Sequence, residues 1–130
     1  MSAAPASVLI ADDGVANRLS LRLELEDRGL VVTEVWDGAS AQLALTARSY
    51  DAVISDMWMP GTDGHSLVRA LQAQNPDIVV LVVTGGGSGL ADPEAIARKW
   101  HAERVYLKPF DLRTLVGDLV GLLEARRSGG

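Results

Sequence analysis

Residues 51–64 read DAVISDMWMPGTDG, where a short apolar run, Ala52–Ser55, ends at Asp56 and passes into a loop rich in proline and glycine. The run contains β-branched residues and shows little alternation of polar and apolar side chains. Such a run is typical of a strand covered on both faces, as in a parallel sheet with helices on either side. The stretch that follows, Gly64–Gln74, predicts a helix, so this part of the chain predicts a strand that leads into a helix.

The same succession of strand and helix occurs five times along the chain. The predicted strands are Val8–Ala11, Leu30–Val35, Ala52–Ser55, Ile78–Thr84 and Arg104–Leu107. The predicted helices are Ala16–Arg28, Ala39–Arg48, Gly64–Gln74, Pro93–His101 and Leu112–Arg126. Because crossovers between parallel strands are right-handed, this α/β pattern predicts a (βα)5 flavodoxin-like three-layer α/β/α sandwich, with a parallel five-stranded sheet in the order 2-1-3-4-5.

Two local features support the predicted helices. Asp37, Asp92 and Asp111 precede helices, where a carboxylate can accept a hydrogen bond from a free backbone N–H group, so we expect all three to be N-caps. In the first helix we expect one apolar face, made by the leucines Leu19, Leu21, Leu23, Leu25 and Leu30.

The chain has 130 residues, which fits one ordinary domain. We expect this domain over residues 7–124, with flexible termini at 1–6 and 125–130. No linker sequence follows Leu123, which favours a complete single-domain protein. With 48% hydrophobic residues and no cysteine, the core is expected to fold without disulfides or thiolate-bound metals.

The net charge excludes some functions. Seventeen acidic and twelve basic residues give a formal charge of −5, which opposes binding to phosphate backbones or anionic lipid, so we expect no direct contact with nucleic acid. The N-terminal residues MSAAPASV lack the features of a signal peptide, and no apolar run is long enough to span a membrane. The sequence therefore predicts a cytoplasmic protein without a membrane contact.

Polar side chains gather where the predicted strands end. Asp12 and Asp13 follow the first strand, Asp56 follows the third, and Thr84 and Lys108 end the fourth and fifth. Ligands of doubly wound sheets bind outside the carboxyl ends of the strands, and neighbouring strands lie about 4.8 Å apart, so these side chains are expected to meet. Three carboxylates without histidine or cysteine suit Mg²⁺, and also Mn²⁺.

This set of groups suits phosphoryl transfer. A metal, a hydroxyl and an ammonium group around a carboxylate can position and neutralise a phosphoryl group, with Asp56 as the nucleophile. Each residue alone has an ordinary explanation: an Asp pair is usually a solvated turn or cap, and a terminal threonine usually bonds locally. Only their joint placement at the strand ends favours a site.

The motifs VLIADD, DAVISDMWMPGTDG, VVLVVTGG and VYLKPF resemble the receiver domain of bacterial two-component response regulators, the CheY-like group. The resemblance implies that Asp56 is the phosphoacceptor, that Asp12 and Asp13 hold Mg²⁺, that Thr84 is the hydroxyl of the switch, and that Lys108 contacts the phosphoryl group. It also implies a metal contact from the backbone carbonyl of Trp58 and a cis bond before Pro109.

The family resemblance also implies partners. The phosphodonor would be a sensor histidine kinase or a histidine phosphotransfer protein. A downstream protein would bind the face formed by the fourth helix, fifth strand and fifth helix, unless the phosphoryl group is passed onward. A homodimer is compatible with the resemblance.

Three features depart from the family pattern. Val105 stands where family members usually carry an aromatic switch residue; Tyr106 is one position away and could take this role only if a bulge turned it to the same face. The glycine run in Thr84–Gly89 is expected to be a hinge. Trp58, two residues after Asp56, is expected to shield the acyl phosphate from water.

Two alternatives remain. Val105 leaves open a pseudo-receiver that binds partners without phosphorylation. A Mg²⁺-dependent phosphatase of the haloacid dehalogenase type would need a second aspartate where Trp58 stands. Trp100 is expected to fill the core, and His65 and His101 to be ordinary surface residues.

Overall fold

A computed structural model describes residues 4–85 and 92–129 of the protein. The main sheet contains the strands β1 (Ser7–Ala11), β2 (Val31–Val35), β3 (Ala52–Asp56), β6 (Val79–Gly85) and β7 (Arg104–Lys108). A small hairpin contains β4 (Trp58–Met59) and β5 (Thr62–Asp63). The helices are α1 (Val15–Asp27), α2 (Gly38–Ala47), α3 (Gly64–Gln74), α4 (Pro93–Trp100) and α5 (Leu112–Gly129).

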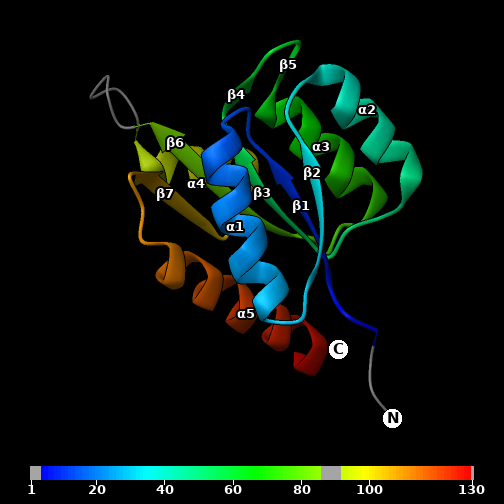
Figure 1. Ribbon diagram of the computed structural model, residues 1–130, viewed down its shortest axis with the longest axis vertical. Helices are drawn as coiled ribbons and strands as arrows, with labels where there is room; N and C mark the ends of the chain where they lie inside the picture. Colours follow the sequence, from blue (N-terminus) through cyan, green and yellow to red (C-terminus); the bar gives the residue numbers. More distant parts are fainter. Residues whose placement is uncertain (1–3, 86–91, 130) are drawn as a thin grey trace.

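The strand order of the main sheet is β2-β1-β3-β6-β7, and every neighbouring pair is parallel. When the hairpin is left out, this is the predicted order 2-1-3-4-5. The helices α1 and α5 lie on one face of the sheet, and α2, α3 and α4 lie on the other (Figure 1). The predicted three-layer flavodoxin-like sandwich is confirmed.

Two apolar clusters, one on each face, hold the layers together. Along β6, Val80 and Val82 belong to the cluster beneath α2, α3 and α4, whereas Val79, Leu81 and Val83 belong to the cluster beneath α1 and α5. All five are fully buried. A strand with helices on both faces has no solvated side, which is why its sequence is uniformly apolar.

The apolar face predicted for α1 is partly wrong. Leu21 and Leu25 are buried, at 1% and 0% exposure, but Leu19 and Leu23 are 53% and 59% exposed. Residues four apart share one face of a helix, whereas residues two apart point in nearly opposite directions, so both leucine pairs cannot face the sheet. The helix therefore carries a second, exposed apolar stripe.

Most element boundaries agree with the sequence prediction within one or two residues. The hairpin β4–β5 was not predicted, because two-residue strands are too short to show a pattern; its turn contains Gly61 at φ +81°. Helix α5 continues to Gly129, beyond the predicted end at Arg126. Residues 1–3 and 130 of the expected flexible ends, and most of the expected glycine hinge, lie outside the described residues.

The predicted N-caps are confirmed. The Asp37 carboxylate accepts a hydrogen bond from the Ser40 N–H, Asp92 from Glu94, and Asp111 from Thr114. Asp63 caps α3 in the same way, accepting from the Ser66 N–H at 2.7 Å, which the sequence analysis had missed. These caps fix where α2, α3, α4 and α5 begin relative to the strand ends.

Helix α3 begins in close contact with the end of β3. The Gly64 N–H donates to the Met57 carbonyl oxygen at 2.8 Å. A Cβ atom on Gly64 would lie 2.1 Å from the Asp56 carbonyl oxygen and 2.9 Å from Cη2 of Trp100. Only a residue without a side chain fits between these atoms.

We predict that Gly64→Ala lowers the free energy of unfolding by about 1 to 3 kcal/mol, because the added methyl group forces the backbone at Asp56 to move. Gly121→Ala is the matched control, since Gly121 is an exposed helical residue with open space around its Cα. That change should raise the free energy of unfolding by up to about 1 kcal/mol. Urea unfolding measures both, and equal effects would contradict the prediction.

Candidate functional site

Three carboxylates meet at the carboxyl edge of the sheet. Ala11 of β1 is in register with Ser55 of β3, which places Asp12 beside Asp56. Asp13 follows directly in the chain. Each of the three carboxylates offers an oxygen atom within 4.8 Å of the others. The structure thus brings together the acidic residues that the sequence predicts to meet.

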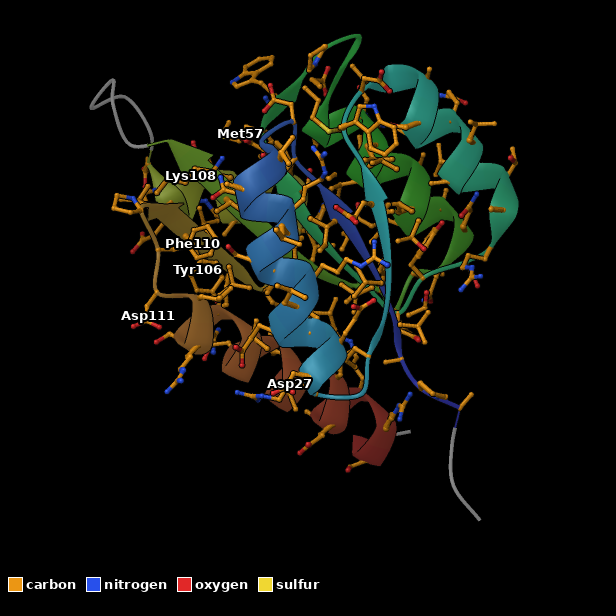
Figure 2. The ribbon with its side chains drawn as sticks, in the orientation of Figure 1. Asp27, Met57, Tyr106, Lys108, Phe110 and Asp111 are labelled. Atoms are coloured by element: carbon orange, nitrogen blue, oxygen red, sulfur yellow. The ribbon has the colours of Figure 1, made fainter. Side chains whose placement is uncertain are left out.

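Lys108 reaches the same place from the end of β7. Its Nζ atom lies 2.8 Å from Oδ2 of Asp56 and 3.2 Å from Oδ2 of Asp12. Figure 2 shows Lys108 and Met57 at the end of the sheet where α1 begins, whereas Asp27 lies at the opposite end of that helix. Strand β6 separates β3 from β7, so only a long side chain could make this contact.

The carboxylates change the ionisation of Lys108. Burial by itself lowers the pKa of an ammonium group, but the hydrogen bond to Asp56 and the charges of Asp12 and Asp56 outweigh burial and raise the pKa of Lys108. The lysine therefore stays charged throughout the physiological range.

Backbone N–H groups fix the two carboxylates that Lys108 contacts. Oδ1 of Asp12 accepts from the Gly14 N–H at 2.7 Å, and Oδ1 of Asp56 accepts from the Met57 N–H at 2.7 Å. In both residues Oδ2 is the oxygen that contacts the lysine. Each carboxylate is therefore held in one orientation by its own turn. These contacts could not be predicted from the sequence, because a backbone donor leaves no signal in residue type.

The residues present fit a divalent metal ion. Three carboxylates and one ammonium group leave two negative charges uncompensated. Oxygen ligands on opposite sides of a Mg²⁺ ion lie about 4.2 Å apart, so a small rotation of these side chains would allow them to share one ion. The oxygen-only donor set agrees with Mg²⁺ or Mn²⁺.

A cavity of about 520 Å³ adjoins the phosphoacceptor candidate, Asp56. Thr84, which is 6% exposed, lines it together with Asp56. Trp58 also lines the cavity and is 71% exposed. That its backbone carbonyl binds metal stays a prediction. The cavity further includes Trp100 of α4, which is 4% exposed, in agreement with its expected place in the core.

The register of β6 and β7 settles the position of the aromatic side chain near Lys108. Val82 pairs with Val105 and Val83 with Tyr106, without a bulge. Val105 packs against the cluster beneath α2, α3 and α4, whereas Tyr106 packs on the opposite face. Thr84 follows Val82 on the first of these faces. Tyr106 therefore does not face Thr84, and the aromatic partner is missing at this place.

Tyr106 has a different contact. Its hydroxyl donates to Oδ2 of Asp118 in α5 at 2.6 Å. Burial and this hydrogen bond raise the pKa of Tyr106 far above its usual value. Figure 2 shows Tyr106 and Phe110 close to the start of α5. The side chain thus attaches β7 to α5.

The fold and the site define a class: a flavodoxin-like α/β domain with an acidic cluster and a lysine at the carboxyl edge of its sheet. The model of the response regulator receiver domain family matches residues 8–119. The chain belongs to the response regulator receiver domain family, whose members are signalling domains of two-component systems rather than classical enzymes. The cis peptide bond between Lys108 and Pro109, which the resemblance implied, is present.

Known relatives differ in length. The chain is 32% identical over 118 residues to the response regulator receiver protein CpdR of Brucella abortus, covering 91% of this chain and 97% of CpdR. It is 35% identical over 121 residues to the transcriptional regulatory protein PrrA of Mycobacterium tuberculosis, covering 93% of this chain but only 51% of PrrA. Relatives therefore include proteins of receiver size and proteins about twice as long.

A solved structure supports the same assignment. The chemotaxis response regulator CheY4 of Vibrio cholerae superimposes with a TM-score of 0.77 at 27% identity, covering 92% of this chain and 99% of CheY4.

None of the helices within residues 4–85 and 92–129 is long and apolar enough to cross a bilayer.

We predict that Mg²⁺ raises the thermal unfolding temperature, because binding to the folded state alone stabilises it by about 2.7 kcal/mol at a concentration 100 times Kd. Asp13→Asn should make the apo protein no less stable, since it removes one of three like charges, but should weaken Mg²⁺ binding about tenfold or more. Thermal unfolding with Mg²⁺ and with EDTA measures this effect.

Asp27→Asn is the control for this experiment. It makes the same change of charge at the far end of α1 (Figure 2) and should leave the Mg²⁺-dependent stabilisation unchanged. Equal stabilisation of wild type and Asp13→Asn would show that the ion binds elsewhere.

Proposed function

We propose that this receiver domain accepts a phosphoryl group on Asp56 from a phosphohistidine donor in a Mg²⁺-dependent reaction. The observation that carries the proposal is the position of Oδ2 of Asp56, 2.8 Å from the Lys108 ammonium group and within the cluster formed with Asp12 and Asp13. A nucleophilic carboxylate beside a cation and a cation-binding cluster is the arrangement that phosphoryl transfer requires.

Each residue of the site has its own role in the transfer. A carboxylate oxygen of Asp56 attacks phosphorus, the P–N bond of the phosphohistidine breaks, and the imidazole leaves with the electron pair of that bond and takes up a proton. Lys108 neutralises charge on the phosphoryl oxygens, and the Thr84 hydroxyl donates to one of them. Asp12, Asp13, Asp56 and the Trp58 carbonyl would hold Mg²⁺, which would supply further neutralisation of the phosphoryl charge. Hydrolysis of the acyl phosphate by water returns Asp56 to its carboxylate form.

The surface beside the site supports a protein as phosphodonor. Val15, Leu19 and Leu23 are 70%, 53% and 59% exposed and follow one another at four-residue spacing along α1, which begins next to Asp13. A hollow of about 450 Å³ borders α1 on the side of Lys108 and Pro109. An exposed apolar stripe of this kind favours contact with a partner. We propose that a sensor histidine kinase or a histidine phosphotransfer protein binds here.

The output is protein contact through the face formed by α4, β7 and α5, or onward phosphotransfer. Leu107 of β7 is 45% exposed and gives this face an apolar residue. One observation favours a second candidate, a pseudo-receiver that binds partners without being phosphorylated. Val105 leaves Thr84 without an aromatic partner, and Tyr106 is bonded to Asp118 on the other face.

The test is phosphorylation with phosphoramidate, a small donor that contains a P–N bond, in the presence of Mg²⁺. Intact mass should increase by one phosphoryl group in the wild type and stay unchanged in Asp56→Asn, because the amide cannot act as the nucleophile. Asp27→Asn should be phosphorylated like the wild type, and EDTA should abolish the reaction. Mg²⁺ binding without a phosphoryl adduct on the wild type would instead support the pseudo-receiver.

We predict that Trp58→Asn accelerates loss of the phosphoryl group several-fold, because Trp58 lines the cavity beside Asp56 and the smaller side chain would leave more room for water. Trp58→Phe keeps an aromatic ring at the same place and should behave more like the wild type. Release of phosphate from the purified phosphorylated proteins measures the rates. If Trp58→Asn decays at the wild-type rate or more slowly, the indole does not protect the acyl phosphate.

A further inference from the structure

A second hollow, of about 310 Å³, opens between α3 and the C-terminal end of α4. The described residues that line it are His65, Arg69, Gln72, Lys99 and His101. Each of these side chains carries nitrogen atoms that can donate hydrogen bonds, and none of them is a carboxylate. These cationic and imidazole groups lie together in a chain whose formal charge is −5.

The two helices hold these groups in fixed relative positions. His65, Arg69 and Gln72 are spaced four and three residues apart and so share one face of α3. The Gln72 amide donates to the Trp100 carbonyl oxygen at 3.0 Å. The His65 ring stacks on the Trp100 indole, with 5.2 Å between ring centroids and 24° between planes. Trp100 is buried, so it anchors the hollow to the core.

The dipoles of α3 and α4 explain the position of only one of the two cations at the hollow. Lys99 lies in the last turn of α4, where a cation complements the helix dipole. Arg69, however, lies at the middle of α3, beyond the first and last turns in which the helix dipole acts, so the dipole does not account for its position.

His101 occupies a backbone conformation that usually belongs to glycine. It follows α4 with φ 52° and ψ 44°, in the left-handed region. Glycine is the ordinary residue at such a helix end, because a Cβ atom is disfavoured there. The histidine at this position places an imidazole at the rim of the hollow.

The hollow's cations also stand outside the ion pairs of the described residues. Those pairs use the basic residues Arg18, Arg22, Arg28, Lys108 and Arg126. Arg69 and Lys99 take part in none of them. The positive charge at the hollow is thus available to a ligand.

We propose that this hollow is a binding site for a small oxyanion with at least two negative charges, of the phosphate or polycarboxylate type. The Arg69 guanidinium offers a planar pair of donors that matches two oxygens of such a group, and Lys99 adds a point charge. The volume is close to the lower limit of about 300 Å³ for ligand sites. A hollow of this size admits a small anion rather than an extended acidic surface.

Anion binding at the hollow does not require phosphorylation of Asp56. The Asp12, Asp13 and Asp56 cluster is negative without metal, so in Mg²⁺-free buffer an anion should be excluded from the phosphoacceptor site. Binding measured under this condition reports on the hollow alone.

Pyrophosphate is the probe, added to the full chain at low ionic strength without Mg²⁺ and followed by calorimetry and by ¹H–¹⁵N spectra. The changes in backbone amide chemical shift on addition of pyrophosphate should be largest at residues 65–72 and 99–102. The double variant Arg69→Gln, Lys99→Gln should bind about tenfold more weakly or worse. The control Arg98→Gln, Arg113→Gln makes the same change of net charge at exposed positions that do not line the hollow, and should stay within about twofold of the wild type.

Several results would overturn the proposal. Equal weakening in both double variants would mean that only the overall charge matters, and shifts concentrated at Lys108 or elsewhere would place the anion at another site. If a hexaglutamate peptide binds more tightly than pyrophosphate, the hollow binds an acidic protein segment rather than a small anion. The spectra also show whether each variant is folded, and Lys99→Gln alone, at an exposed position, provides a milder test of the same site.

Discussion

The structure depends on the repulsion between three carboxylates at one edge of the sheet and on the groups that offset it. Asp12 is only 2% exposed, so its charge would be costly if it were unpaired. Lys108 bonds to Asp12 and Asp56, and backbone N–H groups hold the other oxygen of each. Two negative charges remain at the cluster, and they provide the attraction for a divalent cation and, through it, for a phosphoryl group.

The parallel sheet makes this meeting of side chains unavoidable. Parallel strands present all their carboxyl ends at one edge, and burial of both faces by helices fixes the register. The buried apolar strands β1, β3 and β6 form the rigid part of the site, and the functional groups lie one or two residues beyond a strand or at its last positions. Gly64 fixes the start of α3 relative to the sheet, because its missing side chain allows the helix to begin in contact with the Asp56 backbone.

Much of this could be predicted from the sequence because it follows from local patterns. Uniform apolar runs predicted the strands, aspartates predicted three helix caps, and their order along the chain predicted the sheet and the residues at its edge. The exposure of Leu19 and Leu23 could not be predicted, because a helix with leucines on two faces does not reveal which face meets the sheet. The hollow between α3 and α4 likewise depends on how two helices distant in sequence are placed, which no local pattern contains.

The absence of an aromatic residue at position 105 changes how the site is connected to α4. Val105 is too small to reach the edge of the sheet in the way that a large ring would, and Tyr106 is held by Asp118 on the other face. Trp100 lines the cavity beside Asp56, and a Cβ atom on Gly64 would contact both the Trp100 ring and the Asp56 carbonyl oxygen. The same ring stacks on His65. In this chain, the aromatic side chain that lines the cavity beside Asp56 from the far side therefore comes from α4 rather than from β7.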